Sequence, residues 1–397
     1  MFTAISPSGK LIHVTSAGNE FIPPNPISEK KQYTCPVCRK EVFTRGGKGK
    51  VRKHFAHRHN SSCLRINETE EHALAKTVLC TWLETYGYKP YVEKVIPEAD
   101  GQRADILVYM GGEKVILEIQ HSPLPEMEFV KRQFNYLKAG YTVIWLGIKN
   151  YTKKVNTGKI TNLESLRLCT SPFQHSFSLD LAAGKLLFEY GHTQLQASKY
   201  TYETASLPLS DSPVHLLFPE KQPKLSKEFF QVLEKEWKRT SVIKRKHPKP
   251  DLTEAEKSVI IYYWKNQLNL NYFPALCFLP VPYTAGIKAG AEVWQSWLLF
   301  NFVQRGHNII VSEVLKEMIR SAVFPVYVQS SHANNVMRAA IKEYLILLSS
   351  TGAVRHTYPG VFEVLQPLTI KKTLGTLYAD DDWIRKKFIN YFECKNN

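Results

Sequence analysis

The sequence predicts a mixed α/β protein built around a short antiparallel hairpin. Two apolar runs, 103–108 and 115–120, are separated by a segment with a Gly-Gly pair, which fits a tight hairpin turn. Helical patterns precede and follow the hairpin, and the nearly continuous apolar run 141–146 is typical of a strand buried on both faces. With a further strand at 91–96, the expected order is helix, three strands, helix and strand.

The two helices have recognisable ends. The first is expected to begin at a capping box, 67–70, and to end at Gly87. Glu71 precedes the apolar residues of this helix at helical spacing, so it is expected to point along the buried stripe. The second helix is expected to run from Pro125 to Gly140. Its predicted core face consists of Phe129, Val130, Phe134 and Leu137.

Two carboxylates are expected to meet on the hairpin. Side chains alternate between the faces of a strand, and pairing of the two runs can bring Asp105 beside Glu118. Gln120 shares the face of Glu118 for the same reason. Two acids at the end of an apolar sheet repel each other and lose solvation unless a cation or a proton offsets their charge. A hard divalent cation, Mg²⁺ or Mn²⁺, is therefore predicted there.

An N-terminal segment carries a second ligand pattern. A CxxC knuckle is followed by a basic turn, three histidines and a further cysteine, the donor types of a structural tetrahedral Zn²⁺ site. The simplest assignment of the four ligands is Cys35, Cys38, His57 and Cys63. His54 and His59 remain alternatives to His57, because spacing does not choose between them.

Composition narrows the function classes. Lys plus Arg exceed Asp plus Glu by 52 to 36, and the net charge of +16 favours a polyanionic partner, nucleic acid before membrane. No apolar run approaches the roughly 18 residues needed to span a bilayer. The seven cysteines are not arranged as a disulfide framework, so a cytoplasmic protein is expected.

These motifs resemble those of the PD-(D/E)xK nuclease superfamily and, more narrowly, of the competence protein CoiA family. The chain has Q-R-A-D at 102–105 and E-I-Q-H-S-P at 118–123, preceded by a C-x-x-C…H-F-A-H…C pattern. The resemblance implies a restriction-endonuclease-like core of order αβββαβ, a small zinc-binding module before it and a mostly helical domain after it. It implies a metal-dependent deoxyribonuclease with the following catalytic residues: Glu71, Asp105, Glu118 and Gln120.

Gln120 departs from the superfamily pattern, because it stands where most members have lysine. An amide can orient a water molecule but adds no positive charge to a transition state. Two hypotheses therefore follow. The chain is a nuclease that processes incoming DNA during natural transformation, or a non-catalytic DNA-binding adaptor that assists recombination proteins on single-stranded DNA. Single-stranded or branched DNA is the expected partner, and no membrane contact is expected.

Several polar residues are candidates for contact with DNA. Arg103, on the face of Asp105, either contacts a phosphate or pairs with Asp105. Arg132 and Gln133 follow on the second helix, with His72 as a further candidate on the first. A dense basic run in the C-terminal half supplies the remaining candidates, Lys244, Arg245 and Lys246.

Four segments are predicted along the chain. They are a strand-bearing lead-in with the zinc-finger-like module at 1–66, the nuclease-like domain at 67–193, a linker at 194–222 and a basic helical domain at 223–397. Within the last, a helix near 334–350 followed by a small hairpin matches the outline of a winged helix. The sequence contains no signal of oligomeric state.

Overall fold

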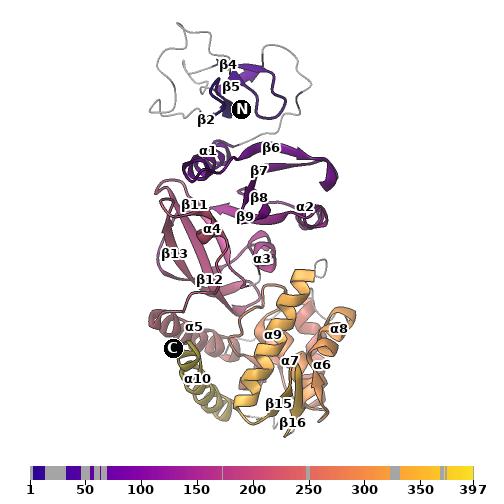
Figure 1. Ribbon diagram of the computed structural model, residues 1–397. Coiled ribbons are helices and arrows are strands. Elements are labelled where there is room, and N and C mark those ends of the chain that lie inside the picture. Colours follow the sequence, from indigo (N-terminus) through magenta and orange to yellow (C-terminus); the bar gives the residue numbers. More distant parts are fainter. Residues whose placement is uncertain are drawn as a thin grey trace. The chain divides into compact units, whose positions relative to one another are not determined.

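A computed structural model describes residues 3–13, 33–45, 54–57, 63, 69–171, 173–246, 251–321, 331–366, 371 and 373–396 (Figure 1). The chain divides into two compact units. Unit 1 comprises 1–152, 177–188 and 206–220, and unit 2 comprises 153–176, 189–205 and 221–397. No helix in the described part of the chain combines the length and the hydropathy needed to cross a membrane.

The N-terminal part of unit 1 is a small sheet. Its strands are β1 (Thr3–Ile5), β2 (Leu11–His13), β3 (Tyr33–Thr34), β4 (Glu41–Arg45) and β5 (His54–His57), in the order β2-β1-β3-β4-β5. A core of four buried side chains holds it together: Ala4, Cys35, Val42 and Phe55. The predicted lead-in therefore belongs to the same sheet as the zinc-finger-like module.

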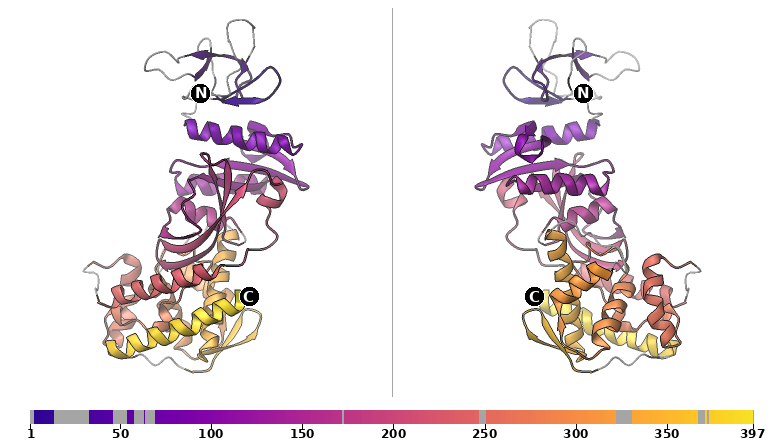
Figure 2. Two further views of the ribbon diagram at one scale, coloured as in Figure 1. Left: turned by 90° about the vertical axis from the view of Figure 1, so that its left-hand side faces the viewer. Right: turned by 90° about the vertical axis from the view of Figure 1, so that its right-hand side faces the viewer.

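The predicted αβββαβ order is confirmed in unit 1. It consists of α1 (Glu70–Thr85), β6 (Tyr91–Ile96), β7 (Gln102–Met110), β8 (Glu113–Ile119), α2 (Glu126–Lys138) and β9 (Thr142–Ile148), with the 3₁₀ turn η1 (Pro97–Ala99) before β7. The strands run in the order β9-β8-β7-β6, and β11 (Ser176–Asp180) extends the sheet beyond β9. β6, β7 and β8 pair antiparallel, whereas β8, β9 and β11 are parallel. Figure 2 shows α1 and α2 on opposite faces of this sheet.

Local sequence explains the boundaries of these elements. Gly111 and Gly112 both adopt positive φ, at 60° and 80°, which is the conformation of a two-residue hairpin turn. The Thr69 side chain caps α1 by accepting a hydrogen bond from the backbone N–H of His72 at 3.2 Å. The chain leaves α1 through Gly87, at φ 78°, as predicted. The other predicted cap residue, Asn67, lies outside the described residues.

The predicted core face of α2 is wrong in part. Its buried side chains are Phe129, Gln133 and Tyr136, whereas Phe134 is 58% exposed. The reason is that two polar residues turn inward, where Gln133 and Tyr136 find buried hydrogen-bond partners. The buried face of α2 is therefore set by these hydrogen bonds as well as by the spacing of its apolar residues.

The predicted linker at 194–222 is also wrong. The long strand β12 (Lys185–Gln196) is followed by β13 (Lys199–Pro208) and the short helix α4 (Pro213–Leu217). In unit 2, β13 pairs antiparallel with β10 (Val155–Lys159), which precedes α3 (Asn162–Cys169). The Ser, Thr and Pro content of this segment is thus compatible with a strand that has paired neighbours on the sheet.

The rest of unit 2 is mostly helical, as predicted. Its helices are α5 (Lys227–Lys246), α6 (Glu254–Lys265), α7 (Ala291–Leu298), α8 (Val311–Ser321), α9 (Ser331–Ser350) and α10 (Leu374–Asn396). Shorter turns are η2 (Leu270–Tyr272), η3 (Ala275–Cys277) and the π-helical η4 (Leu299–Val303). A three-stranded sheet completes the unit with β14 (Ile309–Ile310), β15 (Val354–Tyr358) and β16 (Val361–Val364). One large apolar core joins these elements around Trp294, Tyr263 and Phe362.

Candidate functional site

The two predicted carboxylates face each other in the register of the sheet. Ile106 pairs with Leu117, and one step further in the same register Asp105 stands opposite Glu118. A pocket of about 910 Å³ opens at this end of the sheet. Asp105 lines the pocket, whereas Glu118 has only 1% of its surface exposed and is not among the residues that line the pocket. The sheet therefore brings the pair together, but the two acids differ in access.

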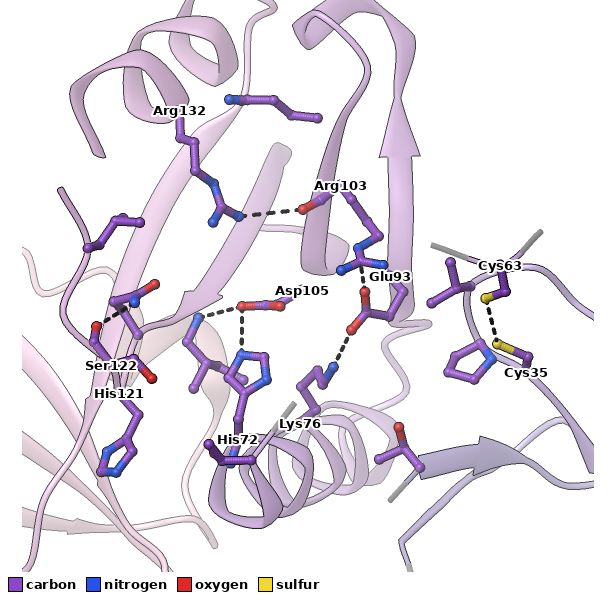
Figure 3. A pocket seen from close by; sticks show the side chains of 18 of the residues that line it. Cys35, Cys63, His72, Lys76, Glu93, Arg103, Asp105, His121, Ser122 and Arg132 are labelled. Atoms are coloured by element: carbon purple, nitrogen blue, oxygen red, sulfur yellow. Dashed lines mark hydrogen bonds and ion pairs between the residues drawn. The ribbon is translucent and has the colours of Figure 1, made fainter. Parts of the chain in front are cut away.

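Asp105 is held by hydrogen-bond donors from two elements (Figure 3). Its Oδ2 accepts the backbone N–H of Ile119 at 2.9 Å and lies 3.2 Å from Nε2 of His72 on α1. Burial alone would raise the pKa of Asp105, but His72, Lys76 and the Ile119 N–H together hold it well below its usual range. Asp105 is therefore an ionised carboxylate in contact with the pocket.

Glu118 is held from the opposite side by α2. Arg132 Nη2 donates to Oε2 at 2.5 Å, and the Tyr136 hydroxyl donates to Oε1 at 2.7 Å. Burial and the nearby charge of Asp105 raise the pKa of Glu118 to about 8, although Arg132 and Tyr136 oppose that rise. Arg132, a candidate DNA contact, also lines the pocket, whereas Tyr136 is buried.

A buried ion-pair chain next to Asp105 was not predicted. Lys76, on the buried side of α1, pairs with Glu93 of β6, and Arg103 Nε lies 2.7 Å from the other oxygen of Glu93. Arg103 was expected to contact phosphate or to pair with Asp105, and its ion-pair partner is Glu93 instead. Glu93 also has a left-handed backbone, at φ 54°. Lys76 is buried in the structure but lies outside the apolar positions expected to face the core, so the sequence carried no signal for this network.

Gln120 lies just past the end of β8, in the lining of the pocket. Its backbone N–H donates to the carbonyl of Leu146 at 2.8 Å, and its side-chain Nε2 donates to the carbonyl of Ser122 at 2.6 Å. The side chain therefore belongs to the pocket lining, as Asp105 does, without adding charge to it.

The expectation that Glu71 points along the buried stripe of α1 is wrong. Its side chain is exposed, and its neighbour His72 is the residue of this turn that reaches Asp105. Of the predicted apolar stripe of α1, Trp82 and Leu83 are buried, and the buried side near Glu71 consists of Ala73, Ala75 and Lys76. In this turn of α1 the residue that turns inward is Lys76, which meets Glu93.

Two of the predicted DNA contacts are buried. Gln133 is 6% exposed, and its Oε1 accepts the indole N–H of Trp145 at 2.6 Å. Arg245 is 1% exposed, and it donates to both carboxylate oxygens of Asp381 at 2.6 and 2.7 Å. Both residues therefore hold elements together instead of facing a ligand.

The other two residues of the predicted basic run on α5, Lys244 and Lys246, differ in their exposure to solvent. Lys244 pairs with the buried carboxylate of Glu292, whereas the side chain of Lys246 is exposed. Only part of the predicted basic surface of this helix is thus available to solvent, since one α-helix turns successive residues to different sides.

The zinc-finger-like module brings the four predicted ligands together. The ligand atoms of Cys35, Cys38, His57 and Cys63 all lie within 4.8 Å of one another. Cys35 Sγ is 3.9 Å from Cys63 Sγ, and Cys38 Sγ is 3.2 Å from His57 Nε2. A sulfur separation of 3.9 Å is far beyond a disulfide bond of about 2.05 Å and matches the edge of a tetrahedron with Zn–S bonds of about 2.3 Å.

The donor set therefore fits a tetrahedral metal such as zinc. His54 does not belong to this group of ligand atoms among the described residues, and His59 lies outside them. The structure thus selects His57 over His54, a choice that spacing left open. Cys35 and His57 are buried, so solvent has little access to these two donors.

Fold and site define the class of the protein: a PD-(D/E)xK nuclease-like α/β domain preceded by a module whose Cys₃His cluster could hold a metal, and followed by a mostly helical domain. Three sequence profiles match along the chain. They are the competence protein CoiA N-terminal domain at 25–65, the CoiA nuclease-like domain at 68–222 and the CoiA C-terminal domain at 229–375. The chain belongs to the competence protein CoiA family.

A curated relative supports this assignment over most of the chain. The competence protein CoiA of Bacillus subtilis (strain 168) is 24% identical over 367 residues, which cover 85% of this chain and 91% of the relative. No solved structure matches the chain.

Proposed function

We propose that the chain is a metal-dependent DNA nuclease that processes incoming single-stranded or branched DNA in the cytoplasm during natural transformation. The observation that carries the proposal is the register of β7 and β8, which sets Asp105 opposite Glu118 at a pocket that also contains arginines. Family membership supports both the nuclease chemistry and the role in transformation, because the matched domain is described as nuclease-like and the relative as a competence protein. Recombination proteins are the proposed partners.

The residues of the pocket fit a divalent cation in part. Asp105 offers a hard oxygen donor of the kind that Mg²⁺ and Mn²⁺ prefer, and its described hydrogen bonds use Oδ2 rather than Oδ1. Both oxygens of Glu118 are in contact with α2, so Glu118 would have to exchange Arg132 for the cation. A cation bound there would supply hydroxide near neutral pH and offset negative charge on a phosphate.

The protein's own side chains would position the substrate. Arg103 and Lys131 place positive charge in the pocket lining, where a DNA phosphate can approach. Gln120 donates through Nε2 to Ser122, which leaves its Oε1 as an acceptor for the proton of an attacking water. His72 orients the carboxylate of Asp105 from α1.

A second function is favoured by two observations on the same site. Gln120 contributes no charge, and Glu118 is already paired with Arg132 and Tyr136. These contacts suit a DNA-binding adaptor that keeps the nuclease-like fold without cutting. The adaptor would bind DNA through the same arginines, so binding does not discriminate between the two functions.

Cleavage of labelled single-stranded, duplex and branched DNA in Mg²⁺ or Mn²⁺ tests the proposal. We expect the wild-type chain to cut and Asp105→Asn and Glu118→Gln to lose about a hundredfold or more in rate. Asp100→Asn is the matched control, because it removes a carboxylate that is 68% exposed at the pocket. DNA binding without cleavage by the wild type, in both metals and on all three substrates, would replace the nuclease with the adaptor.

A further inference from the structure

The C-terminal unit contains an arrangement that the proposed nuclease site does not use. α7 is followed by β14, by the helix pair α8 and α9, and then by the hairpin β15–β16. β16 lies in the middle of the small sheet, where Ile309 of β14 pairs with Phe362 and Val354 of β15 pairs with Val364. A helix pair followed by a hairpin that returns to a strand before the pair is the topology of a winged helix.

The helix α9 is anchored in the core of unit 2 by one side. The side chains that pack inward are Val336, Met337, Ala340, Ile341, Tyr344, Leu345, Leu347 and Leu348. Tyr344 also donates its hydroxyl proton to the carbonyl of Leu276 at 2.9 Å. Such an anchor fixes which side of the helix faces solvent.

The opposite side of α9 displays polar and basic side chains. Within 334–350, where side chains are described, the exposed residues are Asn335, Arg338 and Lys342. They are spaced by three and four positions, so they form one row along the helix. No carboxylate is exposed among these described residues, although Glu343 lies half-buried at the edge of the row.

These residue types suit a DNA groove. Asn and Arg side chains read base edges in the major groove, and Lys and Arg contact phosphates. The following hairpin is exposed along β15 from Arg355 to the tip, where Tyr358 is 72% exposed. Arg355 pairs with Glu363 across the hairpin, which holds its guanidinium on the strand.

We infer that α9 and the β15–β16 hairpin form a surface of unit 2 that binds duplex DNA. The row of Asn335, Arg338 and Lys342 enters the major groove, whose width of about 12 Å admits an α-helix. This inference goes beyond the proposed function, because it concerns no residue of the pocket in unit 1 and requires no cleavage. It also replaces the predicted basic run on α5, in which Arg245 is buried.

Fluorescence anisotropy with labelled duplex and single-stranded oligonucleotides of equal length tests the inference, in full-length protein without added Mg²⁺ or Mn²⁺. We expect Arg338→Ala/Lys342→Ala to weaken duplex binding about tenfold or more and to weaken single-strand binding less than threefold. The matched control is Lys265→Ala/Lys386→Ala, which removes two exposed positive charges from α6 and α10. We expect the control to stay within about twofold of wild type.

Three results would overturn the inference. They are duplex binding by the α9 variant equal to that of the control, an equal loss on single-stranded DNA, and the absence of duplex binding by the wild type. A charge reversal, Lys342→Glu, provides a second variant in which the loss should be at least as large. Unchanged thermal unfolding of each variant separates loss of binding from loss of fold, and cleavage activity does not enter the result.

Discussion

Lys76 carries its charge into the interior of unit 1, where 1% of its surface is exposed. Its ammonium group pairs with Glu93, which is itself paired with Arg103 at the pocket. A buried charge without a partner is costly, so these three residues depend on one another. At the scale of single residues, the wall of the candidate site is therefore held by charge pairs beside Asp105.

Replacing Lys76 tests this dependence. Lys76→Met keeps much of the side-chain length but leaves Glu93 with Arg103 as its ion-pair partner, so we expect the free energy of unfolding to fall by about 3 kcal/mol. Lys76→Met/Glu93→Gln should recover part of that loss. Urea unfolding followed by tryptophan fluorescence measures both, with the exposed Lys138→Met as control. A loss in Lys76→Met no larger than in the control would contradict the role assigned to the pair.

His175 in unit 2 predicts a dependence of stability on pH. Its Nδ1 lies 2.7 Å from the hydroxyl of Ser171, and burial together with the charge of His192 lowers its pKa to about 4. The unfolded chain, with a histidine pKa near 6.5, binds this proton more readily than the folded chain. His175 therefore stabilises the fold above pH 6.5, and that contribution is lost as the pH falls toward 4.

Unfolding free energies measured between pH 7 and 4 check the role of His175. Wild type should lose more stability than His175→Gln over that interval, by up to about 3 kcal/mol, because glutamine takes up no proton. Carboxylates titrate in both proteins, so the difference between the two curves isolates the histidine. Parallel curves would show that His175 does not control the acid sensitivity.

At the scale of elements, the N-terminal sheet is too small to rely on its apolar core. The centre of this sheet consists of Ala4, Val42, Phe55 and Cys35, and Cys35 also belongs to the Cys₃His cluster. A structural zinc contributes about 10 kcal/mol or more to folding in isolated zinc peptides. Metal binding is therefore expected to decide whether this module folds.

Metal analysis of purified variants tests the ligand set. We expect about one zinc per wild-type chain, and loss of zinc in Cys38→Ser and His57→Gln, because each removes one of the four clustered donors. His54→Gln should keep its zinc, since His54 does not belong to the cluster. The module should become more susceptible to limited proteolysis when it loses its zinc. Zinc retained in His57→Gln and lost in His54→Gln would reverse the assignment.

At the scale of the whole molecule, a net charge of +16 is compatible with contact to DNA in both units. The candidate surfaces differ in kind. In unit 1 the basic side chains lie in a pocket beside carboxylates, whereas in unit 2 they form a row on an exposed helix. Total charge therefore says little about which residues contact phosphate, because many basic residues are paired within the fold.

Salt dependence measures how many phosphates the chain contacts. Four contacts would lower the affinity for duplex DNA about a hundredfold between roughly 50 and 200 mM salt, because binding releases condensed counterions. Anisotropy titrations at several salt concentrations give the slope of log affinity against log salt. Arg338→Ala/Lys342→Ala should reduce the magnitude of that slope by about 2. A wild-type affinity that does not change with salt would contradict a phosphate-contacting role for either surface.

The αβββαβ order in unit 1 and the meeting of its two acids could be predicted from the amino-acid sequence. Alternation along β7 and β8, together with two glycines in positive φ, specifies the hairpin and hence the register that sets Asp105 opposite Glu118. The three cysteines of the metal-ligand cluster were predicted in the same way, from donor types at close spacing, whereas the choice of His57 over His54 required the structure. These features are local, so residues near one another in the chain are enough to predict them.

Which polar side chains turn inward could not be predicted from the sequence, because it depends on partners that the fold brings near. Glu71 is exposed, whereas His72 and Lys76 reach the site. Arg245 is buried because it pairs with Asp381, a partner that lies 136 residues away in the chain. Gln133 turns inward for the indole of Trp145 on a neighbouring strand. Charged and amide side chains are buried when a partner satisfies them, and no local pattern reveals a partner supplied by a distant segment.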